Sequence, residues 1–330
     1  MPSLLNNHHK EAKMRLSLLF KLLLTSLIVI TTPIYAYDEP AVNLGYTSFY
    51  DGSPPAGIGA YFQNYFQYYT ASRLNDNRGN SLPFPRNDLQ VTAEILQLIY
   101  LSSFKIGQAN LGISALIPTV VSARVRDGLP QHQLKAQEGF GDLFIGPALQ
   151  FTPVMRRDGH SPLFVQRIEF DVVAPVGRSN PEYSINPSSH FWSINPYWAA
   201  TFWFTPQWST AVRLHYLWNA ENTTPNLSFG PNIRSTQAGQ AIFGNFALGY
   251  AFKPTFTVGL NGYFFDQISD TRVNGHPVPN RDEHVWAVGP GMVSGLSANI
   301  FMFFNLYFEQ NAYNRPQGVN GIWRFVAHLS

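Results

Sequence analysis

The most regularly spaced charged residues in the chain are Arg167, Glu169 and Asp171, which alternate with other residues between Leu163 and Val173. Such side chains can pair as ions, hydrogen-bond a polar solute or line an aqueous passage. Their period of two places all three on one face of a β-strand, because successive side chains point to opposite sides. This pattern fits a soluble sandwich with the charges in water. It fits a membrane barrel equally well, with the charges in the lumen.

Neighbouring serines and histidines are the residues nearest to a catalytic pattern. His190 follows Ser188 and Ser189, and His160 precedes Ser161, but both groups lie in or beside predicted loops. A serine hydrolase needs a serine bonded to a base that a third group orients, and these pairs lack the strand-borne His-x-Ser pattern of barrel lipases. The sequence contains no HExxH, GxSxG or glycine-rich phosphate-binding motif. We therefore expect no enzyme, no cofactor and no metal site.

The rest of the chain shows the same alternation in segments that are long for β-strands of soluble sandwiches. In Trp208–Asn219, for example, Leu214 and Tyr216 oppose Arg213 and His215. We expect twelve strands near residues 56–73, 88–103, 108–125, 140–151, 162–175, 190–204, 208–219, 237–252, 256–268, 284–294, 297–311 and 319–328.

Long and short connections alternate along almost the whole chain. Residues 176–189 and 220–236 are long connections, whereas 205–207 and 253–255 are short. Outer-membrane barrels combine long extracellular loops with short periplasmic turns, and an even number of strands places both chain ends in the periplasm. The predicted fold is all-β, a transmembrane up-and-down antiparallel β-barrel of about twelve strands over residues 56–330.

Aromatic side chains gather near the ends of the predicted strands, as in the interfacial girdle of a membrane barrel. The expected girdle residues are Trp192, Tyr197, Trp198, Trp203, Phe204, Trp208, Trp218, Tyr250 and Trp286. In the whole chain 15% of residues are aromatic and only 13% are charged. Soluble domains contain about 25% charged residues, so this composition favours a membrane location.

The N-terminus predicts a signal peptide over residues 1–36, with four basic residues, an apolar run over 22–30 and Ala36 at the end. A membrane-anchor helix is the alternative, but the run is short for one. Residues 1–36 hold four of the 22 basic and one of the 20 acidic residues, which leaves a net charge of 18 minus 19. This near-neutral chain gives no reason to expect nucleic acid as a partner. Residues 37–55 lack periodicity and predict an irregular periplasmic lead-in.

Several motifs resemble a known family. They are Arg213-Leu-His-Tyr-Leu-Trp-Asn-Ala-Glu-Asn222, Gln237-Ala-Gly-Gln-Ala-Ile-Phe-Gly-Asn-Phe246, Gly141-Asp-Leu-Phe-Ile-Gly-Pro147, Val258-Gly-Leu-Asn-Gly-Tyr-Phe264, Val288-Gly-Pro-Gly291 and Asn314-Arg-Pro-Gln-Gly318. Together they resemble the outer-membrane meta-pathway phenol degradation family, over roughly residues 45–326. The resemblance implies a transporter-like β-barrel in the outer membrane of a diderm bacterium, linked to uptake of aromatic or other hydrophobic compounds. The family name does not imply a phenol-degrading enzyme.

The inward faces of the strands are the expected functional surface. The lumen or pore-lining candidates are Gln63, Tyr65, Gln67, Tyr69, Glu94, Asp142, Arg167, Glu169, Asp171, Arg213, His215, Asn245, Asn261, Glu309 and Arg324. Their mixed charges do not form the single-sign ring of an ion-selective pore. We expect passive passage of small hydrophobic or aromatic solutes, with outer-membrane lipid, lipopolysaccharide and the barrel assembly machinery as other partners. The alternative is a non-conducting scaffold or surface-interaction barrel.

Overall fold

The structure is a computed structural model that describes residues 39–54, 56–131 and 133–329. These residues belong to one compact unit of the chain, residues 36–330. The predicted signal peptide, residues 1–36, lies outside the described residues. In the part of the chain that the structure describes, no helix is long and apolar enough to cross a membrane.

Twelve long strands form the barrel wall, and their ranges follow the predicted ones closely. They are β1 (Gly59–Leu74), β2 (Asp88–Ile106), β3 (Ala109–Arg126), β5 (Leu143–Phe151), β7 (Pro162–Ala174), β8 (Ser193–Trp203), β9 (Trp208–Asn219), β11 (Ala241–Lys253), β12 (Phe256–Gln267), β15 (His284–Gly295), β16 (Ile300–Tyr313) and β17 (Pro316–His328). The connections contain short elements. These are β4 (Gly139–Phe140), β6 (Val154–Met155), β10 (Thr236–Gln237), β13 (Thr271–Val273), β14 (His276–Val278) and the 3₁₀ turn η1 (Leu227–Phe229).

Each long strand pairs antiparallel with its neighbours in sequence, so the wall is an up-and-down meander. β1 closes the ring by pairing with β17, for example Tyr65 with Arg324, while β2 pairs with β3 on the other side. Closure leaves each long strand with two neighbours, so that the ring itself has no free edge strand to present backbone groups to lipid. The prediction of a closed antiparallel barrel is confirmed.

Strand β7 shows how alternating residues point into the lumen and to the outer surface of the barrel. Val165, Glu169 and Val173 are at most 1% exposed, whereas Ile168 and Phe170 are 44% and 47% exposed on the outer surface. The other strands repeat this alternation and surround the barrel with outward apolar side chains. That surface suits a lipid environment, in which the polar backbone groups are already satisfied within the ring.

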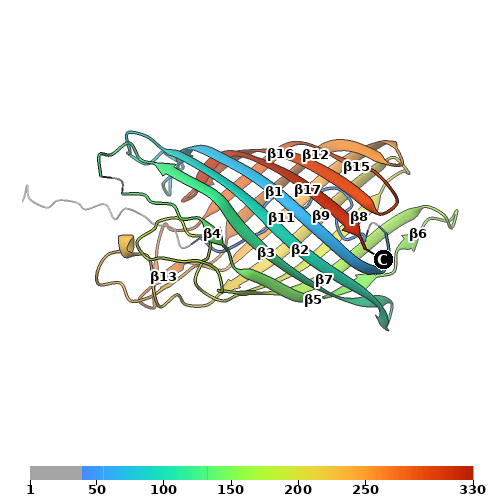
Figure 1. The fold of residues 1–330 in the computed structure, drawn as a ribbon, viewed down its shortest axis with the longest axis horizontal. Coiled ribbons are helices and arrows are strands. Elements are labelled where there is room, and N and C mark those ends of the chain that lie inside the picture. Colours follow the sequence, from blue (N-terminus) through green and yellow to red (C-terminus); the bar gives the residue numbers. More distant parts are fainter. Residues whose placement is uncertain (1–38, 55, 132, 330) are drawn as a thin grey trace, which may run out of the picture. The chain divides into compact units, whose positions relative to one another are not determined.

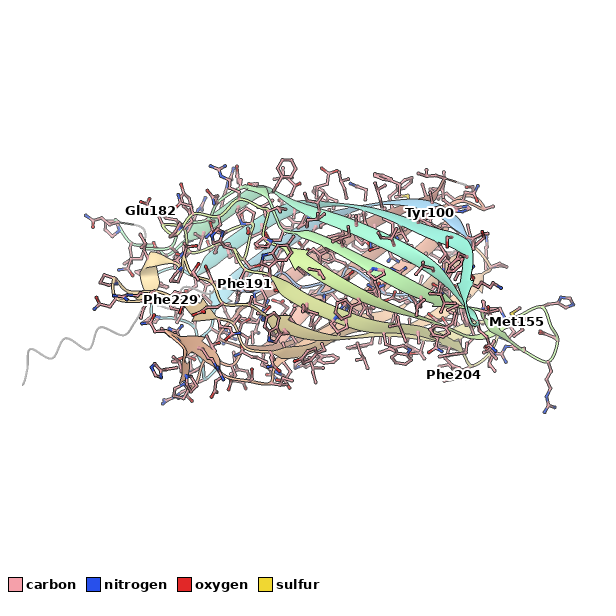
Figure 2. All side chains as sticks on the ribbon, turned by 90° about the horizontal axis from the view of Figure 1, so that it is seen from below. Tyr100, Met155, Glu182, Phe191, Phe204 and Phe229 are labelled. Carbon is pink, nitrogen blue, oxygen red and sulfur yellow. The ribbon has the colours of Figure 1, made fainter. Side chains whose placement is uncertain are left out.

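The two ends of the barrel differ in their connections. The end formed by residues 75–87, 127–138, 175–192, 220–240 and 268–283 is called the long-loop end. The opposite, short-turn end carries the connections 107–108, 204–207, 254–255 and 296–299, together with the C-terminus (Figure 1). Phe204 and Tyr100 lie near the short-turn end and Glu182 lies at the long-loop end (Figure 2). The structure reproduces the alternation of connection lengths with two exceptions, the ten-residue connection 152–161 at the short-turn end and the two-residue turn 314–315 at the long-loop end.

The interior of the long-loop half of the barrel is a packed core. Phe243, Tyr263, Tyr307 and Ile322 from four strands are fully buried there, and Leu44, which precedes the first strand, packs in the same cluster. Close packing of this kind excludes water. The long-loop half of the lumen is filled by side chains.

Candidate functional site

The described residues between 39 and 58 form no strand, and their contacts with the wall place them inside the barrel. This segment is called the lead-in. Its first described residue, Glu39, forms an ion pair of 3.6 Å with Arg315 in the β16–β17 turn at the long-loop end. At its other end Tyr61, at the start of β1, donates a hydrogen bond of 2.5 Å to the carbonyl of Gly57. The lead-in therefore runs through the lumen from the long-loop end to the short-turn end.

Polar groups of the wall bind the backbone of the lead-in near the middle of the barrel. The side-chain oxygen of Asn245 accepts a hydrogen bond of 2.6 Å from the amide of Gly45. The amide nitrogen of Asn245 donates to the carbonyl of Asn43 at 3.0 Å, and the hydroxyl of Tyr307 donates to the carbonyl of Gly45 at 2.8 Å. A segment without a sheet partner must satisfy its buried backbone groups in this way. Asn245 is thus a binding residue for the chain's own lead-in.

Asp51 forms the strongest contact between the lead-in and the wall. Its carboxylate accepts hydrogen bonds from both Nε and Nη2 of Arg213, at 2.8 and 2.6 Å. Bidentate pairs between arginine and carboxylate are among the stronger polar contacts in proteins. Thr201 and Gln150 hold the adjacent carbonyls of Asp51 and Gly52 at 2.5 and 2.8 Å. These contacts fix the lead-in against β5, β8 and β9.

A second ion pair lies nearby on the wall, and it was expected to be part of a lumen charge network. Arg167 pairs with Glu169 on the same strand, and its Nη2 donates to the hydroxyl of Tyr197 at 2.8 Å. Ser114 and Tyr197 each donate to Glu169 at 2.7 Å. Asp171 is also buried on this face, with no hydrogen-bond partner for its Oδ1. The arginine charge is therefore balanced by Glu169 within the wall.

Glu309 forms a separate polar group in the long-loop half of the barrel. Its carboxylate accepts hydrogen bonds from the hydroxyls of Tyr69 and Tyr263, both at 2.7 Å, and from the amide of Gly318 at 2.8 Å. At the same end Arg315 pairs with Glu283 at 2.6 Å. Buried carboxylates require such partners.

Two further candidates are buried on the inner face without contacting the lead-in through a hydrogen bond. His215 stacks on Phe243 with ring centroids 4.2 Å apart, and its Nδ1 lies 2.9 Å from the side-chain oxygen of Asn195. Asn261 is fully buried. Both residues pack within the filled part of the lumen.

The candidates on the first strand also point inward. Gln67 accepts a hydrogen bond from the lead-in residue Tyr46 at 2.8 Å and donates to Asn320 at 3.0 Å. The hydroxyl of Tyr65 lies within hydrogen-bond distance of the side-chain oxygens of both Gln63 and Gln97, at 2.9 and 2.8 Å, and its single hydrogen is shared between them. These contacts lie at the border between the packed long-loop half of the lumen and an open region toward the short-turn end.

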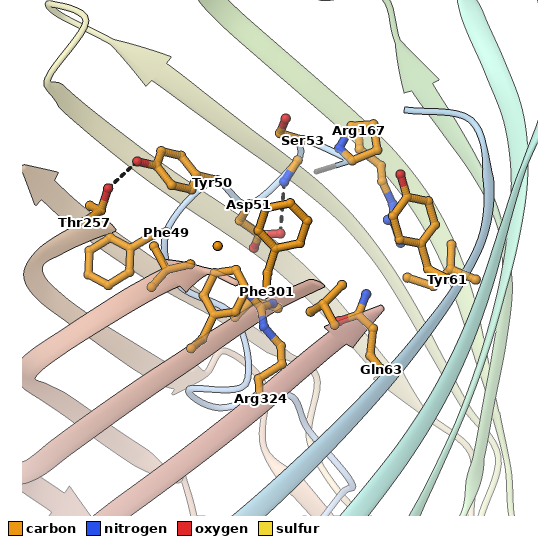
Figure 3. Close-up of a pocket in the computed structure, with 18 of the residues that line it drawn as sticks. Phe49, Tyr50, Asp51, Ser53, Tyr61, Gln63, Arg167, Thr257, Phe301 and Arg324 are labelled. Atoms are coloured by element: carbon orange, nitrogen blue, oxygen red, sulfur yellow. Dashed lines mark hydrogen bonds between the residues drawn. The ribbon is translucent and has the colours of Figure 1, made fainter. Parts of the chain in front are cut away.

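That open region is a cavity of about 510 Å³ in the short-turn half, between the lead-in and the wall (Figure 3). Phe49, Phe301 and Phe303 give it apolar surfaces, while Arg324 and Gln63 are among its polar groups. The exposed turn residues that line it, such as Pro254, lie at the barrel end, so the cavity opens there. Its size and mixed lining are typical of a site for a small molecule.

Glu94 does not lie in the lumen, contrary to expectation. Its neighbours Ala93 and Ile95 belong to the buried core, so the side chain between them must point to the outer surface. There its carboxylate accepts a hydrogen bond of 2.8 Å from Asn64. The sequence was ambiguous here because apolar residues occupy both faces of β2, and the charge alone suggested the wrong face.

Asp142 is fully buried, but it anchors a loop instead of lining the lumen. It lies just before β5 and accepts hydrogen bonds from the amide of Gly177 at 3.2 Å and from the amide and hydroxyl of Ser189 at 2.9 and 2.8 Å. These contacts hold the base of the connection between β7 and β8. The residue therefore stabilises the long-loop end.

Two of the expected girdle aromatics face inward. Tyr197 is 4% exposed and packs under Arg213, whose guanidinium carbon lies 4.2 Å from the ring centroid. Trp203 lines the cavity and stacks on Tyr50 of the lead-in, with ring centroids 6.0 Å apart. Strand parity could have identified both, because they share the odd-numbered face of β8 with Asn195.

The most important residue missing from the sequence-based set is Asp51. It lies in a segment without alternation, and its partner Arg213 is far away in the chain. Its only local signal was a charge in an otherwise nearly uncharged segment, which is compatible with a solvated loop. The sequence therefore contained no specific signal for this pair.

Comparisons with known proteins agree with this architecture. Residues 71–325 match the family described as "Putative MetA-pathway of phenol degradation". The chain belongs to this family. No curated protein matches the sequence.

Solved structures show the same fold. The COG4313 outer membrane channel from Pseudomonas putida F1 matches with a TM-score of 0.71 and 16% sequence identity, covering 87% of this chain and 99% of that chain. The toluene transporter TbuX from Ralstonia pickettii matches with a TM-score of 0.40 and 10% identity, covering 84% of this chain and 92% of that chain. At that score the second similarity supports no conclusion. The first shows that this member of the family has the fold of an outer-membrane channel.

Proposed function

We propose that this protein mediates passive uptake of small hydrophobic or aromatic compounds across the outer membrane. The observation that carries the proposal is the cavity of about 510 Å³ inside the barrel, whose lining includes Phe49, Tyr61, Trp203, Phe301 and Phe303. Aromatic walls bury apolar solutes and stack on rings. Membership of the family is consistent with this solute class.

Uptake by cells tests the proposal, because lipopolysaccharide slows the entry of hydrophobic compounds. Cells lacking the chain are compared with cells that express it, using toluene and benzyl alcohol as solutes and a disaccharide as control. We expect expression to raise the initial uptake rate of both aromatic solutes several-fold, with no change for the disaccharide. Equal uptake of the aromatic solutes with and without the chain would contradict the proposal.

A non-conducting scaffold is the second candidate, because the lead-in and the packed core fill the long-loop half of the lumen. A scaffold needs no solute passage, and in that case the lead-in would block the lumen permanently. Equal uptake in the cell experiment, combined with an unchanged low conductance after the lead-in is loosened, would favour this alternative.

A further inference from the structure

The charges around the cavity do not balance locally. Its charged lining residues are Arg167, Arg213, Arg324 and Asp51, three cations and one anion. Asp51 forms the bidentate pair with Arg213, and Arg167 is paired with Glu169 in the wall. Arg324 is the one cation among these lining residues that forms no ion pair of its own with a described carboxylate.

Arg324 is buried as well as unpaired. Its side chain is 8% exposed, its Nε has no hydrogen-bond partner, and none of the described carboxylates forms an ion pair with it. The guanidinium carbon lies 3.6 Å from the ring centroid of Phe303 and 6.0 Å from that of Tyr65. Cation–π contacts offset part of the desolvation of a buried arginine without using its in-plane N–H groups, and the Nε–H among these has no hydrogen-bond partner.

The surroundings of Arg324 select more than charge. Phe301 and Phe303, two residues apart on β16, and Phe49 of the lead-in line the same cavity as Arg324, and Phe49, Phe301 and Arg324 are labelled in Figure 3. A carboxylate accepts two parallel hydrogen bonds from a guanidinium, and an aromatic ring packs well against phenylalanine. An inorganic anion would use only the first of these features, and a neutral aromatic only the second.

From these contacts we infer that the cavity is a binding site for a small aromatic monocarboxylate. The carboxylate binds the guanidinium of Arg324, and the ring packs among Phe49, Phe301 and Phe303. The cavity opens at the short-turn end, so the ligand enters or leaves from that side. This inference rests on the proposed function and narrows its solute class from aromatic compounds in general to those that carry one carboxylate.

The first test compares ligands on the unmodified protein in lipid nanodiscs. Benzoate, benzyl alcohol, benzylammonium and acetate are titrated by calorimetry. We expect benzoate to bind at least about tenfold more tightly than benzyl alcohol, because a hydrogen-bonded charge contributes about that factor. Acetate should bind more weakly than benzoate, and benzylammonium should not bind. Equal affinities for benzoate and benzyl alcohol, or for benzoate and acetate, would overturn the inference.

The second test removes the cation. Arg324→Gln should abolish the preference for benzoate over benzyl alcohol, so that the ratio of the two affinities falls to about one. Arg324→Lys, which keeps the charge without the planar fork, should retain part of the preference. Arg126→Gln, at an exposed arginine in β3, is the matched control and should bind like the parent. A full benzoate preference in Arg324→Gln would exclude this arginine as the binding group.

The inference remains testable if Arg324→Gln fails to fold, because the ligand series on the parent protein decides it without any variant. It is also separable from the proposed function. Selective benzoate binding without any effect on aromatic uptake in cells would contradict uptake and leave the binding site standing. Uptake of toluene combined with equal binding of all four ligands would support the proposed uptake and overturn the inferred binding site.

Discussion

The carboxylate of Asp51 accepts two hydrogen bonds from the guanidinium of Arg213, at 2.6 and 2.8 Å, and so joins the lead-in to strand β9 inside the barrel. Both side chains are at most 10% exposed. The pair is thus buried on the path that any solute crossing the lumen must take. We therefore expect this pair to contribute most to keeping the lead-in in place.

Replacing Asp51 by Asn should loosen the lead-in. The substitution leaves Arg213 buried without its counter-charge, and removing one partner of such a pair costs about 3–5 kcal/mol of stability. We expect a lower midpoint of urea unfolding and a higher single-channel conductance in planar bilayers. Asp270→Asn, at an exposed residue between β12 and β13, serves as the control and should change neither measurement. A folded Asp51→Asn protein with the parent's conductance would show that the ion pair does not retain the lead-in.

Two glycines of the lead-in allow a matched test of its close packing. Gly52 and Gly57 both have positive φ angles, of 81° and 91°, so alanine is strained at either position. At Gly52 an added Cβ would also lie 2.6 Å from the carbonyl oxygen of Ala199, whereas at Gly57 it would meet no atom within 4 Å. We expect Gly52→Ala to lower the unfolding midpoint clearly more than Gly57→Ala. Equal effects would mean that the contact with β8 is not tight in the membrane.

The position of Glu39 gives a direct test of the threaded lead-in. The chain contains no cysteine, so single cysteines label without background. Asn80→Cys and His276→Cys, in long loops, should react with an impermeant maleimide on intact cells, and Glu39→Cys should react with them, because Glu39 pairs with Arg315 at the same end. Pro206→Cys and Pro254→Cys should react only after the outer membrane is opened. A Glu39→Cys that labels like Pro254→Cys would place the lead-in in the periplasm.

Glu94 is expected to cost stability, because it lies on the outer face opposite Phe66, near the middle of β1. A charged side chain on the lipid face of a barrel is destabilising, by up to about 2–4 kcal/mol for a basic residue at midplane and less for an acidic one. Glu94→Leu should therefore raise the urea midpoint of the protein folded in phospholipid vesicles. Gln97→Leu, on the inner face, should lower it, because Gln97 bonds to Tyr65. Destabilisation by Glu94→Leu would mean that the contact with Asn64 outweighs the cost of the charge.

The sequence by itself determined the wall of this protein. Strand β9, predicted over 208–219 and found at Trp208–Asn219, and strand β7, predicted over 162–175 and found at Pro162–Ala174, show why. Alternation is a local property of an extended backbone, so neighbouring residues reveal both the strand and its two faces. The number of strands and the alternation of connections then determine an up-and-down barrel.

Only the tertiary structure decided what fills the lumen. Asp51 and Arg213 are 162 residues apart, and ring closure brings them together because the lead-in enters a space enclosed by all twelve strands. A segment without alternation has no local pattern that records such contacts. The face of Glu94 was decided in the same way, since Ala93 and Ile95 gained partners in the core only when the barrel closed around them. The periodicity of a strand separates its two faces. Where both faces are apolar, as in β2, the face that points into the lumen is decided by the side chains that barrel closure brings against it.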